Sequence, residues 1–217
     1  MSSRTNVAHY NLSDTAFHIN YRLAGSIAQT ELLRMQLKRE EASEQMQEQL
    51  DNVPAAWYEE AYRQEQTRLQ DFTESLLETA LHTKSYGPRH LDQPALRALV
   101  MNSWLYLHTA TIICLHALCI MSNHVHVVLS APEGKQLDTG RLIRQHKSYT
   151  ARRCNVLLGQ RGTSFWAKNY FDRTIRQGAW LTTMWYVLNN PVKAKLVSQW
   201  SDWPGTYVNP LYASHFS

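Results

Sequence analysis

The alternation of apolar and polar residues predicts a strand near the start of the chain, followed by a long helical segment. Residues 17–24 (FHINYRLA) alternate and are rich in aromatic and β-preferring types, which is typical of a strand. From Thr30 to His82 apolar residues recur at helical spacing. Asn52-Val53-Pro54 interrupts this segment, because proline disfavours an α conformation in the residue before it. We therefore expect a charged helical hairpin over residues 30–82.

The rest of the chain predicts alternating helices and strands. Asp92 is a candidate N-cap for a helix at 93–107, and Asp138 or Thr139 is a candidate N-cap for a helix at 140–158. Residues 121–123 form a tight connection between two apolar segments. The predicted ranges are a helix at 93–107, strands at 111–120 and 124–130, a helix at 140–158, one strand or two short ones at 165–175, and a helix at 179–189 that stops before Pro191.

This order of elements defines an expected fold class. Two central strands joined by a tight turn must run antiparallel. We predict an α+β fold with a ferredoxin-like antiparallel sheet on a split βαβ plan, with helices on one face. Residues 1–217 are expected to form one domain, with 30–82 as an acidic helical insert. The aromatic C-terminal segment, 198–217, is expected to pack onto the body.

The charge is distributed unevenly along the chain. The net formal charge is +4, yet residues 31–85 hold 12 acidic and 6 basic residues. The remaining residues carry 16 basic and 6 acidic side chains, and residues 141–176 contain nine bases and only one acid, Asp172. Such a concentration indicates a polyanionic partner, most commonly nucleic acid. The alternative is a solvated basic face balanced by the acidic insert.

Cysteine count and hydropathy narrow the class of protein. Three cysteines cannot all pair and no CxxC occurs, so disulfide-stapled and zinc-ribbon folds are disfavoured. The longest apolar runs are far shorter than the roughly 20 residues of a membrane span. The first twenty residues contain no apolar segment typical of a secretory signal. We expect a cytoplasmic, nucleoid-associated protein without a membrane partner.

Candidate metal ligands occur on a predicted strand and a predicted helix. His124 and His126 project to the same side of their strand, so two imidazoles can share one metal ion. Tyr186 and Asn190 are spaced i, i+4, which places phenol and amide on one helical face. Two imidazoles with an amide oxygen and open positions suit Mg²⁺ or Mn²⁺. The alternatives are unliganded, hydrogen-bonded histidines and a tyrosine packed in the core.

Four motifs in order resemble the REP-associated tyrosine transposases, a branch of the single-tyrosine HUH transposases. They are MSNHVHVVLS, the basic helix at 140–155, FWAKNYFDRTIR, and WYVLNNPVKAKLV followed by WSDWPGTY. The resemblance covers about residues 85–207, and FHINYRLAGS adds a first strand. It implies that His124 and His126 are the metal pair, Tyr186 is the nucleophile and Asn190 is the polar metal-side residue one turn later.

Two features differ from this family. Many relatives have Gln where this chain has Asn190, and the acidic insert at 30–82 is longer than the corresponding part of compact relatives. The acidity of the insert disfavours contact with phosphates, so we expect it to lie outside the active site.

The resemblance implies metal-dependent cleavage and rejoining of single-stranded DNA at REP-like hairpins through a 5′-phosphotyrosine, as in DNA transposition. A free tyrosine has a pKa near 10, so only about one in 10³ is phenolate at pH 7 and help from a metal is expected. No GxxxxGK[ST] loop occurs, consistent with a reaction that conserves bond energy and needs no ATP. The resemblance suggests a monomer, but a homodimer with Tyr186 acting in trans stays open.

Candidate DNA contacts come from basic and aromatic side chains. Cations can bind phosphates, and aromatic rings can stack on unpaired bases. For each aromatic, including Tyr149 and Tyr170, the alternative is core packing. The resemblance adds a segment containing Trp166, Asp172, Arg173 and Arg176. The DNA-binding candidates are Arg22, Arg144, Lys147, Arg152, Arg153, Trp166, Arg173 and Arg176.

Three other classes of protein are alternatives to a transposase. A protein derived from a transposase could bind hairpins without cutting them. Such a protein would not need His124, His126, Tyr186 and Asn190, so the presence of all four disfavours this alternative. A replication initiator or relaxase would use the same chemistry, but relaxases usually carry a larger histidine cluster and an appended domain. A zinc hydrolase is disfavoured because no HExxH motif or further His/Cys triad occurs at metal spacing.

Overall fold

The structure, a computed structural model, describes residues 16–82, 87–176 and 178–216. These residues form two compact units. The body combines the chain up to Tyr21 with the chain from His90 onward, and the helical hairpin runs from Arg22 to Arg89.

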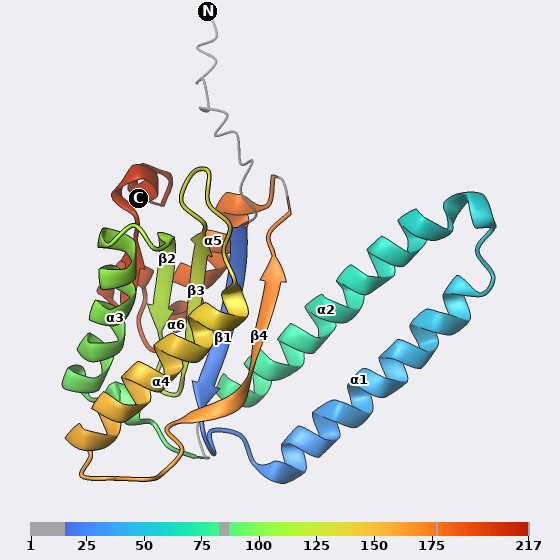
Figure 1. The fold of residues 1–217 in the computed structure, drawn as a ribbon. Coiled ribbons are helices and arrows are strands. Elements are labelled where there is room, and N and C mark those ends of the chain that lie inside the picture. The colour runs from blue at the N-terminus through green and yellow to red at the C-terminus, as the bar shows by residue number, and fades with distance from the viewer. Residues whose placement is uncertain (1–15, 83–86, 177, 217) are drawn as a thin grey trace, which may run out of the picture. The chain divides into compact units, whose positions relative to one another are not determined.

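The body is built on a five-stranded sheet in the order β4-β1-β3-β2-β5 (Figure 1). β3 separates β1 from β2, which is the split βαβ plan expected from the sequence. β2 and β3 pair antiparallel, with Cys119 opposite His126. The predicted α+β class is therefore confirmed. The strands are β1 (Ala16–Leu23), β2 (Cys114–Ile120), β3 (His124–Ser130), β4 (Trp166–Thr174) and β5 (Thr206–Val208).

Helices cover both faces of the sheet, and not one face as predicted. On one face, Tyr21 of β1 contacts Trp104 of α3 (Pro94–Thr109) and His146 of α4 (Thr139–Leu157). On the other, His18 of β1 contacts Tyr186 of α5 (Trp180–Leu188). Adjacent strand residues point to opposite faces. Because β3 is buried at every residue, its sheet needs a covering layer on each side.

The α5 face contains the core that supports the candidate site. Trp203 and Gly205 tie the C-terminal segment to the end of β2, because Trp203 Nε1 donates to the Ile120 carbonyl at 2.8 Å and the Gly205 carbonyl accepts from Ile120 N, also at 2.8 Å. This segment adds β5, which pairs antiparallel with β2, between the 3-10 turns at Trp200–Asp202 and Pro210–His215. The core on this face includes Ala117, Cys119, Met121, Val128, Trp180, Met184, Val187, Leu188 and Tyr212.

Three boundaries differ from the predictions. Asp92 does not cap α3, because it belongs to a 3-10 turn (His90–Asp92) and Gln93 occupies the N-cap before Pro94. α3 extends to Thr109, and Thr111 adopts a left-handed φ of 53°, so β2 begins only at Cys114. The predicted cap by Asp138 is confirmed, since its carboxylate accepts from Arg141 N at 2.8 Å.

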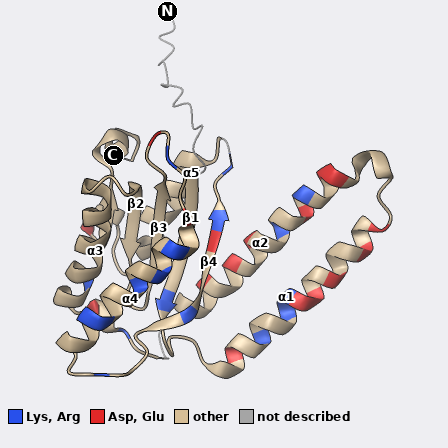
Figure 2. Cartoon of the chain, in the orientation of Figure 1, with Lys and Arg blue, Asp and Glu red and all other residues tan. Residues whose placement is uncertain are grey.

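The helical hairpin consists of α1 (Gln29–Leu50), a 3-10 turn (Ala55–Trp57) and α2 (Tyr58–His82). Both helices carry acidic and basic side chains (Figure 2). Several lie at helical spacing, such as Arg63 Nη2 at 2.9 Å from Glu60 Oε2. No helix among the described residues is both long enough and apolar enough to cross a membrane.

A buried polar network joins β1 to α3 and α4 inside the body. Trp104 Nε1 donates to the Tyr21 hydroxyl at 3.0 Å, and that hydroxyl lies 2.8 Å from His146 Nε2. His146 Nδ1 lies 3.1 Å from Ser103 Oγ. Burial lowers the pKa of His146 to about 3, so the ring is neutral at pH 7.

We predict that this network makes stability depend on pH. Between the ordinary histidine pKa of about 6.5 and a folded pKa of about 3, the unfolded chain binds a proton that folded His146 does not. The free energy of unfolding should therefore fall as pH falls, by up to about 1.4 kcal/mol per pH unit from this residue. Urea unfolding of the unaltered protein and His146→Gln at pH 7, 6, 5 and 4 measures this contribution. Equal pH slopes for the two proteins would contradict it.

Candidate active site

The two histidines of β3 lie on the sheet face that α5 covers. His124 and His126 are buried, with ring centroids 4.9 Å apart, and one nitrogen of each ring lies within 4.8 Å of the other. His124 Nδ1 is 2.7 Å from the Asn123 side-chain oxygen. Because an amide oxygen only accepts, Nδ1 of His124 carries the hydrogen and Nε2 carries a lone pair. His124 is therefore in the form that can bind a metal through Nε2.

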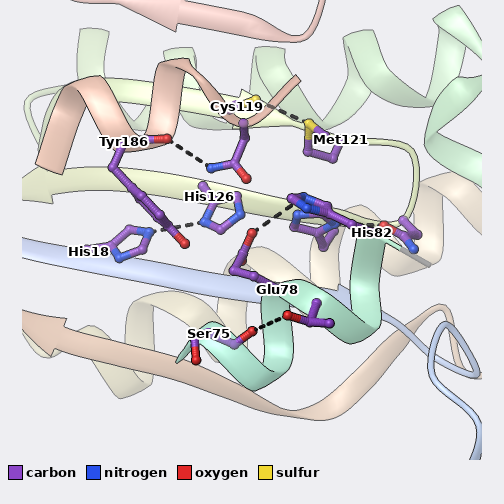
Figure 3. A network of polar contacts seen from close by, with 12 residues as sticks. His18, Ser75, Glu78, His82, Cys119, Met121, His126 and Tyr186 are labelled. Carbon is purple, nitrogen blue, oxygen red and sulfur yellow. Dashed lines mark hydrogen bonds and ion pairs between the residues drawn. The ribbon is translucent and has the colours of Figure 1, made fainter. Parts of the chain in front are cut away.

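Tyr186 extends from α5 toward the histidines of the sheet (Figure 3). Its half-buried ring stands edge-on to His126, with centroids 6.0 Å apart and planes at 90°. It also stands edge-on to His18 of β1, at 5.7 Å and 81°. The structure thus brings together Tyr186 and the β3 pair, which the sequence places about 60 residues apart. It adds His18, which sequence reasoning did not single out.

The sequence pattern predicts Tyr186 and Asn190 on one face of a single helix. In the structure, Asn190 lies close to Tyr186 but belongs to a different helix. α5 ends at Leu188, and Asn190 begins a separate short helix, α6 (Asn190–Lys193). Pro191 lacks an N–H, so the α5 hydrogen-bond ladder cannot continue through it. The Asn190 side-chain nitrogen nevertheless donates to the Tyr186 carbonyl at 3.1 Å. The amide therefore still lies one turn from the phenol-bearing residue.

The Asn190 side-chain oxygen is available as a ligand. Asn190 is fully buried, and among the described residues this oxygen has no hydrogen-bond partner. An unsatisfied buried acceptor is costly and requires an explanation, of which a cation is one. The lone pair on His124 Nε2 and this unsatisfied oxygen are both donor types that a divalent metal ion accepts.

Lys193 places a positive charge over the Tyr186 ring. Its Nζ lies 3.9 Å from the ring centroid, within the range of a cation–π contact. α6 makes this contact possible, because its single turn brings the chain back toward α5. The sequence places Lys193 seven residues after Tyr186, where one uninterrupted helix would have put it two turns away. Helical periodicity alone therefore could not predict the contact between Lys193 and Tyr186, because it depends on the break between α5 and α6 at Asn189.

A basic cavity of about 530 Å³ lies between α4 and β4, on the other face of the sheet. Arg144 and Lys168 line it and are exposed. Lys147 Nζ donates to the carbonyls of Ala167 at 2.7 Å and Lys168 at 3.0 Å, which fixes its charge on the wall. Tyr170 also lines the cavity, and burial together with the charge of Asp172 raises its pKa. This arrangement of cations and an aromatic ring suits a polyanion.

The remaining DNA-binding candidates are dispersed. Arg153 lines a second cavity of about 800 Å³ between α3 and α4, and Arg152 is exposed on α4. Arg173 is half-buried on β4, and Arg176 follows β4 and is exposed. Arg22 is half-buried and belongs to the helical hairpin, where its guanidinium donates to the Leu23 carbonyl and Ser26 hydroxyl at 3.4 Å. Burial lowers the pKa of Arg22.

Trp166 is mostly enclosed in the core of the body. The side chain is only 6% exposed, and its ring centroid lies 4.7 Å from that of Tyr21. Its Nε1 donates to Thr150 Oγ1 at 2.9 Å. This enclosure favours the core-packing alternative, and because Trp166 also lines the cavity between α4 and β4, its contact with DNA stays a prediction. Tyr149 and Tyr170 remain at least partly accessible.

Comparison with known proteins supports the resemblance found in the sequence. Residues 105–190 match the family "Transposase IS200 like". The predicted resemblance is confirmed. This range contains His124, His126, Tyr186 and Asn190, the four residues assigned from the HUH transposase motifs.

The fold resembles that of a solved transposase structure. A REP-associated tyrosine transposase bound to a REP hairpin aligns over 94% of this chain and 82% of its own, with 12% identity and a TM-score of 0.50. A putative transposase from Deinococcus radiodurans aligns over 88% of this chain and 97% of its own, with 15% identity and a TM-score of 0.37. No curated protein matches the chain.

Proposed function

We propose that this IS200-like transposase relative cleaves and rejoins single-stranded DNA, with Tyr186 as the nucleophile. The observation that carries the proposal is the position of the Tyr186 ring, edge-on to His126 and one turn before the unsatisfied oxygen of Asn190. A phenol packed only for stability would not require a pair of buried imidazoles and a buried amide oxygen beside it. This combination supports phosphoryl transfer over hairpin binding without cleavage.

The proposed reaction exchanges one phosphoester bond for another. The Tyr186 oxygen bonds to phosphorus, the bond to the 3′ oxygen breaks, and the phenol proton is released while the leaving 3′ oxygen takes up a proton. The product is a 5′-phosphotyrosine and a free 3′-OH. A 3′-OH of another strand then attacks the same phosphorus and releases Tyr186, so no ATP is consumed.

The side chains around Tyr186 support this chemistry. Lys193 holds an ammonium over the ring, where it can attract a phosphate. His124, His126 and Asn190 would hold a divalent ion, Mg²⁺ or Mn²⁺, which when bound withdraws charge from the scissile phosphate. The buried position of both histidines limits the access of water to the reacting atoms.

We propose hairpin DNA with a single-stranded flank as the substrate. The structural neighbour with a TM-score of 0.50 is bound to a REP hairpin, and residues 141–176 of this chain carry nine bases against one acid. The cavity between α4 and β4 places Arg144, Lys147 and Lys168 together, as phosphate binding requires. We further propose that Arg22, on the helical hairpin, and Arg152, Arg153, Arg173 and Arg176, dispersed over the body, each make additional phosphate contacts.

Within the proposed function, the first prediction concerns the nucleophile. Tyr186→Phe should still bind hairpin DNA but form no covalent adduct, because the substitution removes only the attacking oxygen. Labelled single-stranded DNA carrying a hairpin, incubated with Mn²⁺ and resolved on a denaturing gel, detects the adduct. Tyr106→Phe, an exposed tyrosine of α3, is the matched control and should retain it. An adduct that persists in Tyr186→Phe would refute the assignment.

The second prediction concerns the metal ligands. His124→Ala and His126→Ala should each weaken Mn²⁺ binding by more than about tenfold, as measured by calorimetry. Cleavage by the unaltered protein should stop in excess chelator and return with added Mg²⁺ or Mn²⁺. His215→Ala, an exposed histidine at the C-terminal 3-10 turn, should bind Mn²⁺ normally. Full cleavage activity in excess chelator would contradict the metal role.

The third prediction concerns the basic cavity. Arg144→Ala should weaken hairpin binding at every sequence tested, and reduce the steepness of the log–log salt dependence by about 0.7 to 1. Arg39→Ala, which removes an exposed arginine from acidic α1, should leave the slope unchanged. Binding titrations between low and moderate salt measure both slopes. Identical slopes for Arg144→Ala and the unaltered protein would place the DNA elsewhere.

A further inference from the structure

His18 meets His126 edge to edge inside the body. Their nearest nitrogens, Nε2 of His18 and Nδ1 of His126, are 3.1 Å apart, and their planes differ by only 11°. The centroid separation of 5.4 Å is close to the largest that such a nitrogen contact permits, so the rings lie side by side and not face to face. This is the geometry of a hydrogen bond in the plane of both imidazoles.

The strand order explains why these two rings meet. β1 and β3 are neighbours in the sheet although 108 residues separate His18 from His126. Both side chains are fully buried on the face covered by α5, and both stand edge-on to Tyr186. His18 therefore belongs to the same cluster as the proposed metal ligands, although it lies outside the family match at 105–190.

We propose that His18 is a positioning residue that accepts a hydrogen bond from His126 Nδ1 and so keeps the lone pair of His126 on Nε2. This inference rests on the proposed function, because it assigns His126 Nε2 as the metal-binding atom. In a neutral imidazole one nitrogen donates and the other accepts, so the partner of Nδ1 decides what Nε2 can do. If His18 instead donated, His126 Nε2 would carry a hydrogen and could not bind the ion.

The neighbouring histidine is held in the same way. Asn123 accepts from His124 Nδ1 at 2.7 Å, which leaves the lone pair of His124 on Nε2. With His18 accepting from His126, both imidazoles of the pair present the same nitrogen. Asn123, which precedes His124 in the sequence, and His18, which comes from a different strand, thus each fix the tautomer of one histidine. Partners of this kind orient metal-bound histidines and typically change metal affinity by about 10 to 100-fold.

Two variants of His18 separate positioning from packing. His18→Phe keeps a flat ring of similar shape but removes the acceptor. His18→Gln places an amide oxygen near the position of Nε2 and can still accept from His126 Nδ1. We expect His18→Phe to weaken Mn²⁺ binding by about 10 to 100-fold in calorimetry, and His18→Gln to restore it to within about threefold of the unaltered protein. A purely structural role would not distinguish the acceptor-bearing variant in this way.

Nitrogen NMR of the imidazoles in the metal-free, unaltered protein tests the same inference without a variant that could fail to fold. We expect His126 to carry its hydrogen on Nδ1 and none on Nε2. A His126 hydrogen on Nε2, or Mn²⁺ binding by folded His18→Phe equal to that of the unaltered protein, would overturn the inference. Failure of the proposed function is distinct, since the unaltered protein would then form no covalent DNA adduct, whatever the tautomer of His126.

Discussion

Side-chain alternation along two neighbouring strands is the constraint on which the candidate site depends. His124 and His126 point to one face of β3, and the adjacent β1 adds His18 to that face. The same alternation sends Tyr21 to the opposite face, where it supports α3 and α4 through a buried network. A shift of one residue in the pairing of either strand would exchange the two faces, and would separate the imidazoles from Tyr186.

The break between α5 and α6 places an amide and an ammonium group beside Tyr186. Pro191 stops the α5 hydrogen-bond ladder, and the turn that follows brings the Asn190 amide and the Lys193 ammonium back toward Tyr186. A single straight helix would have carried Lys193 away from the phenol. The C-terminal segment supports this arrangement from the far edge of the sheet, where Trp203 and Gly205 bond to Ile120.

Periodicity and turn chemistry were sufficient to predict the central strands, the two long insert helices, the Asp138 cap and the antiparallel sheet. They failed where a feature depends on tertiary contacts. β5 has only three residues, too few to show a period. The sequence alone does not show that the Trp166 ring packs against Tyr21. Among the site residues, the β3 pair is visible because its spacing is local. His18 becomes visible only when the strand order places β1 beside β3. Tyr186 and Asn190 were paired by helical spacing, and they remain close for a different reason, the turn into α6.

The proposed mechanism requires the Tyr186 oxygen to form a bond to a DNA phosphate. Peptide mapping by mass spectrometry tests it most directly, after the unaltered protein has reacted with hairpin-bearing single-stranded DNA and the DNA has been digested to a short remnant. If Tyr186 is the nucleophile, the remnant is attached through a 5′-phosphate to Tyr186 and to no other residue. A remnant on a different side chain, or cleaved DNA with no covalently modified peptide, would contradict it.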